Sequence, residues 1–322
     1  MFKRIAILAT GLAIPLVLLQ SCQQAANGSN TSSPEQGVAD MHQPEPFQPT
    51  QQWKDYWYAG KGELTSYKLT QSRYGELHNG TTVIVFVTED LSAQKQVKLD
   101  DPASAGADKL PVLKMNQSTK FVTGIYPYSM MLSTFQPVDI HTYPHAVKVT
   151  ASVQEWCGMT YYQMNARKDK FQMESRSYFE SEGDKNTEMD PVLQEDELWN
   201  WIRIAPDKLP VGAQKMFPGA YYLRLSHHTA AVTNVTCSLQ DENGLRTYTM
   251  EMPDLNRTLK IHFQAAFPYK IMGWEDTFPG FDGKPLTTKG EYMKYILLDY
   301  WRAHNNDDRA LRKELDLPED WQ

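Results

Sequence analysis

Several residues in this chain could carry chemistry, and their spacing limits what each could do. His141 and His145 are four residues apart but flank Pro144, so no regular helix can align both imidazoles on one metal ion. His227 and His228 are adjacent, and on a strand they would point to opposite faces. The histidine pattern therefore predicts no metal site, and we expect no cofactor.

A hydrolytic site would require tertiary structure to bring a nucleophile and a base together. Ser226 precedes His227, but neighbouring strand side chains diverge. Glu155 follows an apolar strand face, so it is either an inward carboxylate with a raised pKa or the end of the buried segment. Asp276 and Asp282 could hold calcium or form a solvated turn. The sequence contains no G-x-S-x-G, H-E-x-x-H or G-x-x-x-x-G-K-[ST] motif, so we assign no catalytic residue.

Two cysteines, Cys157 and Cys237, fall on the apolar faces of predicted strands. A disulfide between them would close a loop of about 80 residues and stabilise the fold in an oxidising compartment. Two buried free thiols are the alternative, and we favour them because facing inward does not make the cysteines adjacent.

The third cysteine, Cys22, ends an N-terminal pattern typical of a bacterial lipoprotein signal. Lys3 and Arg4 precede an apolar run over residues 5–19, which is shorter than the roughly 20 residues of a membrane-spanning helix. The small residue Ser21 stands before Cys22. We therefore expect cleavage after residue 21 and lipidation of Cys22, which would attach the protein to a membrane.

Composition separates a tether from a folded body. Residues 23–52 are rich in Gln, Ser, Asn and Pro and have too few large apolar residues to form a core. The whole chain carries a net charge of −7, and loss of Lys3 and Arg4 with the signal would make it −9. An acidic chain of this kind argues against nucleic-acid binding.

Alternating apolar and polar residues predict a mainly β body. Such alternation covers residues 147–154, 170–176 and 259–264, with turn residues at Asn79-Gly80, at 167–170 and at 242–244. We expect curved antiparallel sheets, as a half-barrel or a meander, with two subdomains as an option. Helical spacing predicts a helix over residues 194–204 and C-terminal helices over 288–304 and 307–315 that pack on the sheet.

These patterns divide the chain into four parts: a signal peptide over residues 1–21, a lipidated cysteine and tether over 22–52, a β-rich body over 53–283 that may be subdivided near 184–191, and a C-terminal helical segment over 284–322. Dense aromatic and Met groups in the body could line an apolar pocket on a curved sheet or could be ordinary core. The candidate pocket residues are Trp57, Tyr58, Tyr126, Tyr128, Met130, Met131 and Trp156.

Several short stretches resemble a family of Bacteroidota lipoproteins of unknown function. They include residues 55–61, 72–76, 86–90, 155–158 and 267–270. Members are sometimes labelled septum formation inhibitor Maf, but the Ser-Pro-Arg-Arg type motif of Maf pyrophosphatases is absent here. The β-rich pattern is also loosely similar to LolA-like half-barrels, which shield lipid.

Gln23 rather than Asp follows Cys22, which by analogy with lipoprotein sorting favours the outer membrane. Residues 23–27 lack the acidic residues of a surface-export tag, so we expect the periplasmic face, with surface exposure as the alternative. The leading hypothesis is a non-enzymatic binding module for an apolar ligand, a lipid or an envelope partner protein. The alternatives are an envelope hydrolase and a structural component of the envelope or of cell division.

Overall fold

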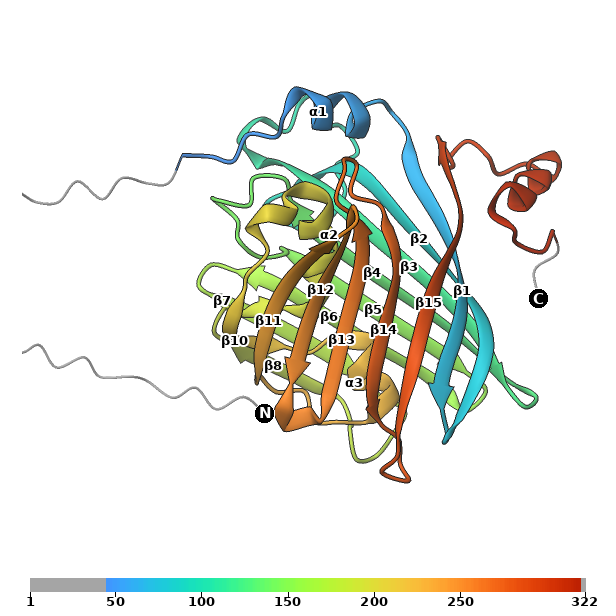
Figure 1. The fold of residues 1–322 in the computed structure, drawn as a ribbon. Helices are drawn as coiled ribbons and strands as arrows, with labels where there is room; N and C mark the ends of the chain where they lie inside the picture. Colours follow the sequence, from blue (N-terminus) through green and yellow to red (C-terminus); the bar gives the residue numbers. More distant parts are fainter. Residues whose placement is uncertain (1–44, 320–322) are drawn as a thin grey trace, which may run out of the picture. The chain divides into compact units, whose positions relative to one another are not determined.

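The computed structural model describes residues 45–319. The predicted signal peptide, Cys22 and most of the tether lie outside these residues. Within them, no helix has both the length and the hydrophobicity to cross a bilayer. The prediction of a mainly β fold is confirmed, because long antiparallel strands dominate the described chain (Figure 1).

The strands in chain order are β1 (Gly62–Arg73), β2 (Glu76–Ser92), β3 (Lys109–Thr123), β4 (Tyr126–Pro137), β5 (Lys148–Glu155), β6 (Gly158–Arg167), β7 (Lys170–Arg176), β8 (Lys185–Met189), β9 (Leu193–Gln194), β10 (Gly212–Phe217), β11 (Thr233–Glu242), β12 (Leu245–Met252), β13 (Arg257–Gln264), β14 (Ile271–Pro279) and β15 (Pro285–Leu298). The helices are α1 (Gln51–Trp57), α2 (Glu195–Ile204) and α3 (Ala220–Ser226), with short 3-10 helices η1 (Gly106–Asp108), η2 (Pro206–Lys208), η3 (Pro253–Leu255) and η4 (Asn306–Leu315).

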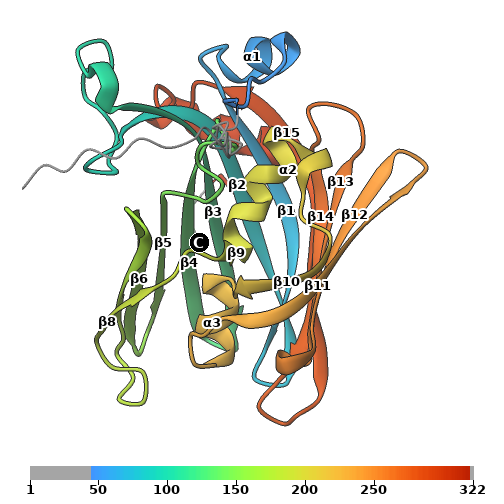
Figure 2. The ribbon, with the colours of Figure 1, turned by 90° about the vertical axis from the view of Figure 1, so that its left-hand side faces the viewer.

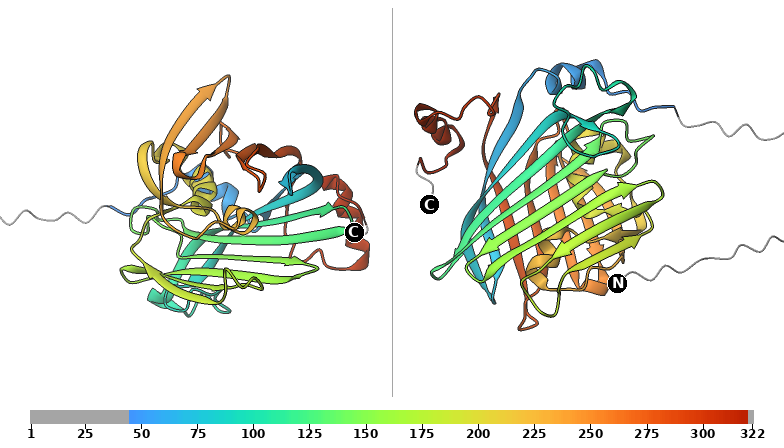
Figure 3. Two further views of the ribbon diagram at one scale, coloured as in Figure 1. Left: turned by 90° about the horizontal axis from the view of Figure 1, so that it is seen from below. Right: turned by 180° about the vertical axis from the view of Figure 1, so that it is seen from behind.

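All fifteen strands belong to one sheet in the order β8-β7-β6-β5-β4-β3-β2-β1-β15-β14-β13-β12-β11-β10-β9. Only the short β9–β10 pair among them is parallel. The N-terminal and C-terminal halves meet where β1 pairs with β15, and the sheet curls into an open half-barrel (Figure 3). The two edge strands, β8 and β9, are consecutive in sequence, so residues 190–192 link one edge of the sheet directly to the other.

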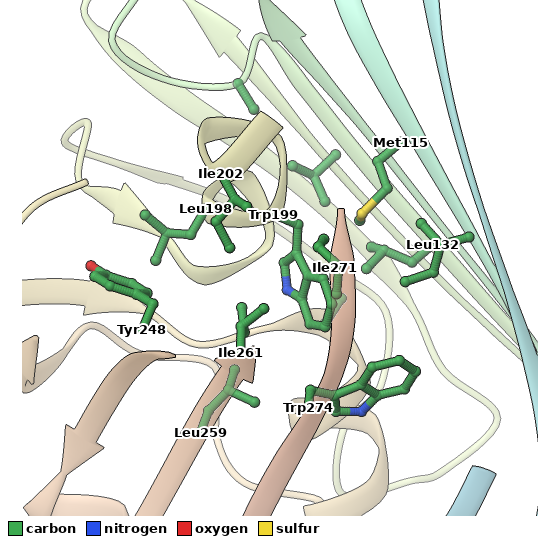
Figure 4. Packing of buried hydrophobic residues seen from close by; sticks show 14 of the residues in the cluster. Met115, Leu132, Leu198, Trp199, Ile202, Tyr248, Leu259, Ile261, Ile271 and Trp274 are labelled. Atoms are coloured by element: carbon green, nitrogen blue, oxygen red, sulfur yellow. The ribbon is translucent and has the colours of Figure 1, made fainter. Parts of the chain in front are cut away.

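Helices α2 and α3 lie inside the curve, between the wall formed by β3–β6 and the wall formed by β10–β14 (Figure 2). Leu198, Trp199 and Ile202 of α2 pack among apolar side chains from both walls, including Met115 and Ile261 (Figure 4). The alternation seen in the sequence follows from this arrangement, because one face of each strand meets the filled interior and the other meets solvent.

Three sequence-based predictions about the elements are wrong. Residues 285–298 form the central strand β15 rather than a helix, although the short helix expected near residue 307 occurs as η4. Asn79-Gly80 lies inside β2, where a Cβ on Gly80 would stand 2.3 Å from the Lys120 carbonyl oxygen, so the glycine permits close strand approach. Residues 184–191 contain β8 and do not divide the sheet into subdomains.

Candidate functional site

Helix α2 is buried inside the half-barrel although half of its residues are polar. Its charged and amide side chains at Glu195, Asp196, Glu197, Asn200 and Arg203 are all buried. A charge removed from water must be paired or neutralised. Each of these side chains accordingly contacts a group on another part of the chain, which fastens α2 to its surroundings.

The strongest of these attachments joins Arg203 to Glu63 of β1. The guanidinium Nη1 and Nη2 donate to Oε1 and Oε2 of Glu63 at 2.6 and 2.7 Å, and the Tyr56 hydroxyl donates to Oε2. Burial raises the pKa of Glu63, but the charge of Arg203 and the hydrogen bonds from Arg203 and Tyr56 together outweigh burial, so the pKa is lowered. This cluster ties α1, β1 and α2 together, and its carboxylate has no oxygen left to react.

A second buried network centres on Arg257 of β13. Its guanidinium contacts both oxygens of Glu195 at 2.5 and 2.8 Å, and both oxygens of Asp276 at 2.7 and 2.9 Å. Two carboxylates therefore share one cation. Burial raises the pKa of Asp276 despite the attraction of Arg257.

Asp196 lies beside this network without a cation of its own. Its Oδ2 accepts a hydrogen bond from the backbone N–H of Ala220 at 3.0 Å. Burial, together with the negative charge of Glu195, raises the pKa of Asp196 to about 7. Two neighbouring carboxyl groups in such different environments are a pattern seen in acid–base catalysis, so the space around them decides whether a substrate could enter.

That space is a cavity of about 60 Å³. Its walls include Gln117, Asp196, Trp199, Tyr222, Arg257 and Thr288. A cavity of this size with polar side chains in part of its wall has room for a few water molecules, whereas ligand pockets usually enclose about 300–1,000 Å³. The interior therefore does not provide the acyl-chain pocket or the substrate cleft considered from the sequence.

Two open depressions occur on strand residues. One, of about 390 Å³, includes His262, Glu275 and Lys289, and the other, of about 430 Å³, is lined by β6, β7 and β8. Polar and charged side chains make up most of both linings, and several pair with one another, such as Lys289 with Glu275 at 2.9 Å. Neither has the apolar walls expected of a lipid site.

The predicted apolar pocket does not form, because its residues are distributed over two ends and two faces of the sheet. Trp57 is buried in the core at the α1 end, and the neighbouring Tyr58 is exposed. Met130 is buried in the core, whereas Met131 points to the other face of β4 and is exposed.

The remaining predicted residues, Tyr126, Tyr128 and Trp156, do lie together. The ring centroids of Trp156 and Tyr126 are 5.8 Å apart, and those of Tyr126 and Tyr128 are 5.6 Å apart. These side chains belong to the hairpins β3–β4 and β5–β6, at the end of the sheet opposite α1 (Figure 1).

The turns at this end carry large exposed apolar side chains. We call this set the aromatic rim, and it comprises Tyr74, Ile125, Trp156, Tyr178 and Phe281. The exposed fractions of these residues range from 55% for Tyr74 to 81% for Ile125. Such side chains gain from leaving water, so a group of them at one end of a molecule indicates an interaction surface.

Side-chain contacts connect members of the rim through a layer beneath it. The Arg73 guanidinium carbon lies 4.3 Å from the Tyr74 ring centroid and 5.7 Å from that of Phe281. The ring centroid of Phe281 is 5.8 Å from that of His227, which in turn contacts Phe179 at 5.1 Å. Phe179 contacts Tyr178 at 5.5 Å. Tyr74, Phe281 and Tyr178 of the rim are therefore connected rather than isolated side chains.

One ion pair and several hydrogen bonds order this underlying layer. Arg224 of α3 donates to Glu155 at 2.5 Å, and His227 Nδ1 lies 2.6 Å from Oε1 of Glu182. The other ring nitrogen of His227 faces guanidinium donors of Arg224 and Arg73 at 3.2 and 3.4 Å. We assign Nδ1 as the protonated nitrogen, since Nε2 must accept from these cations.

This layer does not form a hydrolytic triad. Ser177 Oγ donates to Glu182 at 2.5 Å, so the glutamate lies between the serine and His227, and no imidazole is placed to take the serine proton. Ser226, the serine considered from the sequence, bonds the backbone N–H of His228 at 3.2 Å. Glu155 is inward as considered, but Arg224 pairs with it.

The cysteine and metal predictions have clear outcomes in the described residues. Cys157 and Cys237 are free thiols; Cys237 is buried on β11, but Cys157 is exposed in the β5–β6 turn and not on an apolar face. Asp276 binds Arg257 inside the sheet, whereas Asp282 lies in the β14–β15 turn, so they do not form a calcium loop. Residues 45–319 contain no group of three His, Cys, Asp or Glu side chains arranged to hold a metal ion.

Sequence reasoning missed the residues at the centre of the rim, Arg73, Tyr74 and Phe281. The available signal was an aromatic residue in a two-residue turn: Tyr74-Gly75 joins β1 to β2, and both residues have positive φ. Asn-Gly is the usual choice for such a turn, so a tyrosine there is unexpected.

No protein-family model matches this chain, and no curated protein matches it. Among solved structures, the chain is similar to a β-barrel-like protein of a domain of unknown function, DUF1849, from Brucella abortus. The TM-score is 0.43 with 8% sequence identity, over 74% of this chain and 98% of that chain.

Proposed function

We propose that this protein is a non-enzymatic lipoprotein of the cell envelope that binds a partner protein through the aromatic rim. The observation that carries the proposal is the connected group of exposed aromatic side chains on the turns opposite α1. Trp and Tyr are the residues that contribute most to protein–protein interfaces when a partner excludes water from them.

The shape of the surface favours a protein over a small apolar ligand. The rim consists of projecting turns, and in the described part of the chain the cavity beside α2 and α3 behind it has a volume of about 60 Å³. A lipid chain would need a larger enclosed space, whereas another protein can cover projecting side chains from outside.

The proposed anchor fits this arrangement. The described chain starts beside the α1 end, where the Glu45 carbonyl oxygen lies 2.9 Å from His141 Nδ1. A lipid on Cys22 would thus connect to the end of the domain that lies away from the rim. We propose the outer membrane as the site of attachment, from the residues that follow Cys22.

Site-specific photo-cross-linking in cells of the source organism tests the proposal. A photoreactive phenylalanine analogue would replace Trp156 or Phe281 in the rim, and Tyr58, an exposed aromatic residue at the other end, would serve as the matched control. We expect both rim positions, but not position 58, to cross-link to the same protein, identified by mass spectrometry. The purified partner should then bind the wild-type protein and lose affinity for the Trp156→Ala variant.

Equal cross-linking from position 58, or cross-links from the rim to lipid alone, would contradict the proposal. The anchor has a separate test in metabolic labelling with palmitate. We expect label on the wild-type protein and none on a Cys22→Ala variant. An exported, unlabelled wild-type protein would overturn the anchor and leave the rim hypothesis standing.

A further inference from the structure

Arg73, the last residue of β1, lacks the carboxylate partner that every other buried arginine of the described chain has. The arginines buried to less than a tenth exposure are Arg73, Arg203, Arg224 and Arg257. Arg203 pairs with Glu63, Arg224 with Glu155, and Arg257 with Glu195 and Asp276. No described carboxylate lies within ion-pair distance of Arg73, which is 5% exposed. A buried cation without a counter-charge is costly, and it calls for an explanation.

The hydrogen bonds of Arg73 satisfy its guanidinium only partly. Nη1 donates to the carbonyl oxygen of Leu225 at 2.5 Å. The contacts with the hydroxyls of Tyr128 and Tyr74 and with His227 Nε2 are all 3.4 Å long. Weak hydrogen bonds of this length leave the planar guanidinium of Arg73 able to bind a better acceptor through two parallel N–H groups.

Aromatic side chains of the rim cover Arg73. Tyr74 stacks on the guanidinium from a backbone with φ of 55°, which is strained for a bulky residue. Phe281 covers it from the β14–β15 turn, and both rings are more than half exposed. Exposed side chains of two turns therefore lie between the cation and solvent.

We infer that Arg73 is the receptor for a carboxylate of the partner protein, presented between apolar residues that pack on Tyr74 and Phe281. This inference rests on the proposed function of the rim. A carboxylate is planar and matches the guanidinium fork with two parallel hydrogen bonds. Its charge would neutralise Arg73 when the interface excludes water.

The charges around the rim favour one carboxylate of a protein over an anionic membrane. Binding to anionic lipid usually requires a cluster of Lys and Arg residues. Here Glu155, Glu182 and Asp282 surround the rim, and the nearby cations Arg224 and Lys284 are already paired, with Glu155 and Asp282 respectively. The surface thus offers a single recessed positive charge within an apolar setting.

The test uses the full-length protein in detergent. The probe is phenylacetate, because phenylacetate combines a carboxylate with an aromatic ring. Phenylacetamide, which is uncharged, and inorganic phosphate are the comparison probes. We expect phenylacetate to shift the Arg73 Nε–H resonance with saturation, at a Kd on the order of millimolar. The shift should be absent with phenylacetamide and weaker with phosphate.

Variants assign the effect to the fork of Arg73. Arg73→Gln should abolish the binding of phenylacetate, and Arg73→Lys, which keeps the charge but not the fork, should weaken it roughly tenfold. Arg246→Gln makes the same chemical change in an arginine paired with Asp207 and Asp241, and it should bind phenylacetate as the wild type does. The Arg73 resonance of the wild type is read directly, so the inference remains testable even if Arg73→Gln does not fold.

Equal responses to phenylacetamide, stronger binding of phosphate, or full binding by Arg73→Lys would overturn the inference. If the rim captures a partner and phenylacetate does not bind at Arg73, only the carboxylate inference falls. If phenylacetate binds at Arg73 and cross-linking finds no partner, the proposed function falls, and with it the partner protein as the source of the carboxylate, while Arg73 remains a carboxylate site.

Discussion

Two buried carboxyl groups of this protein, Glu63 and Asp196, behave in opposite ways, and the cation beside Glu63 explains the difference. Glu63 is held by both nitrogens of one arginine, so its pKa is lowered even though it is buried. Asp196 has only a backbone N–H, and the same kind of burial raises its pKa to about 7. Asp196 should therefore make folding sensitive to pH near neutrality.

Replacing Asp196 with Asn should remove that sensitivity. In the folded protein the Asp196 carboxyl group keeps its proton up to about pH 7. In the unfolded chain the same carboxyl group loses its proton near pH 4. The folded state binds more protons between these values, so its stability falls as pH rises from 4 to 7 and is level above that. Asn mimics the protonated form and keeps an oxygen for the Ala220 N–H. We expect Asp196→Asn to exceed the wild type in stability at pH 8 by roughly 4 kcal/mol and to match it at pH 4.

Urea unfolding of both proteins across this pH range measures the difference directly. The difference between variant and wild type isolates position 196 from the other titrating groups. Glu182, whose pKa is lowered, is a suitable control position, because its contribution is present at neutral pH and is lost on acidification. If Asp196→Asn were less stable than the wild type at pH 8, Asp196 would be ionised there and its charge would stabilise the folded state.

Sequence reasoning identified part of the rim and could not identify its centre. Tyr126, Tyr128 and Trp156 were predicted, with four other residues, to line an apolar pocket because aromatic and Met residues are dense there; the three do lie together, but at the end of neighbouring hairpins rather than in a pocket. Trp57 was misplaced because closeness in sequence does not show at which end of a sheet a residue lies. The importance of Arg73 depends on the lack of a described carboxylate near its side chain, and no sequence pattern predicts such a lack.

At the scale of elements, β15 shows how a strand can resemble a helix. Its register with β1 shifts between Ser66 and Tyr67, because Lys294 pairs with the first and Tyr292 with the second. The extra residue, Met293, forms a bulge and breaks the alternation of period two. Gly290 also takes an inward position with no apolar side chain to mark it. Tyr292 and Ile296 are four residues apart, which is the spacing of one helix face. For this reason the segment was predicted as a helix.

Gly290 is the position where β15 is most sensitive to a small change. A Cβ there would lie 2.2–2.4 Å from three carbons of the Trp274 ring. That ring cannot easily move, because Tyr67 and Trp199 pack against it with ring centroids 5.1 and 5.6 Å away. Overpacking of this kind costs about 1–3 kcal/mol. We therefore expect Gly290→Ala to lower the free energy of unfolding by that amount, measured by urea denaturation.

Two further variants test this explanation. Gly280→Ala places a methyl group in a turn, 3.3 Å from a carboxylate oxygen of Asp282, and should change stability much less. Trp274→Phe removes the ring atoms that clash, so the double variant with Gly290→Ala should be more stable than the sum of the two single effects predicts. Strict additivity would mean that the glycine is needed for some reason other than the Trp274 ring.

At the scale of the folded body, the half-barrel is completed by side chains rather than by hydrogen bonds. No ladder joins the edge strands β8 and β9 in the described sheet. Instead Phe217 of β10 packs with Met164, Phe171 and Met173 of β6 and β7, and its ring stacks on Tyr162 with centroids 6.5 Å apart. This cluster, the seam, keeps the two walls together around α2 and α3. The rim draws residues from turns of both halves of the sheet, and the layer beneath it includes His227 just after α3, so its arrangement depends on the seam.

Replacing Phe217 with Ala should open the seam and leave the rest of the sheet folded. Loss of a buried Phe costs about 3–5 kcal/mol, and here the missing contacts are the ones that join the walls. We expect faster hydrogen exchange in β6, β7 and β8, which lie at or next to the seam, than in β1, β2 and β15, which lie in the middle of the sheet. Phe263→Ala removes an equally buried ring from β13 in the main core and should lower stability similarly. If Phe263→Ala speeds exchange in β6–β8 as much as Phe217→Ala does, the walls are held by the core as a whole and the seam has no separate role.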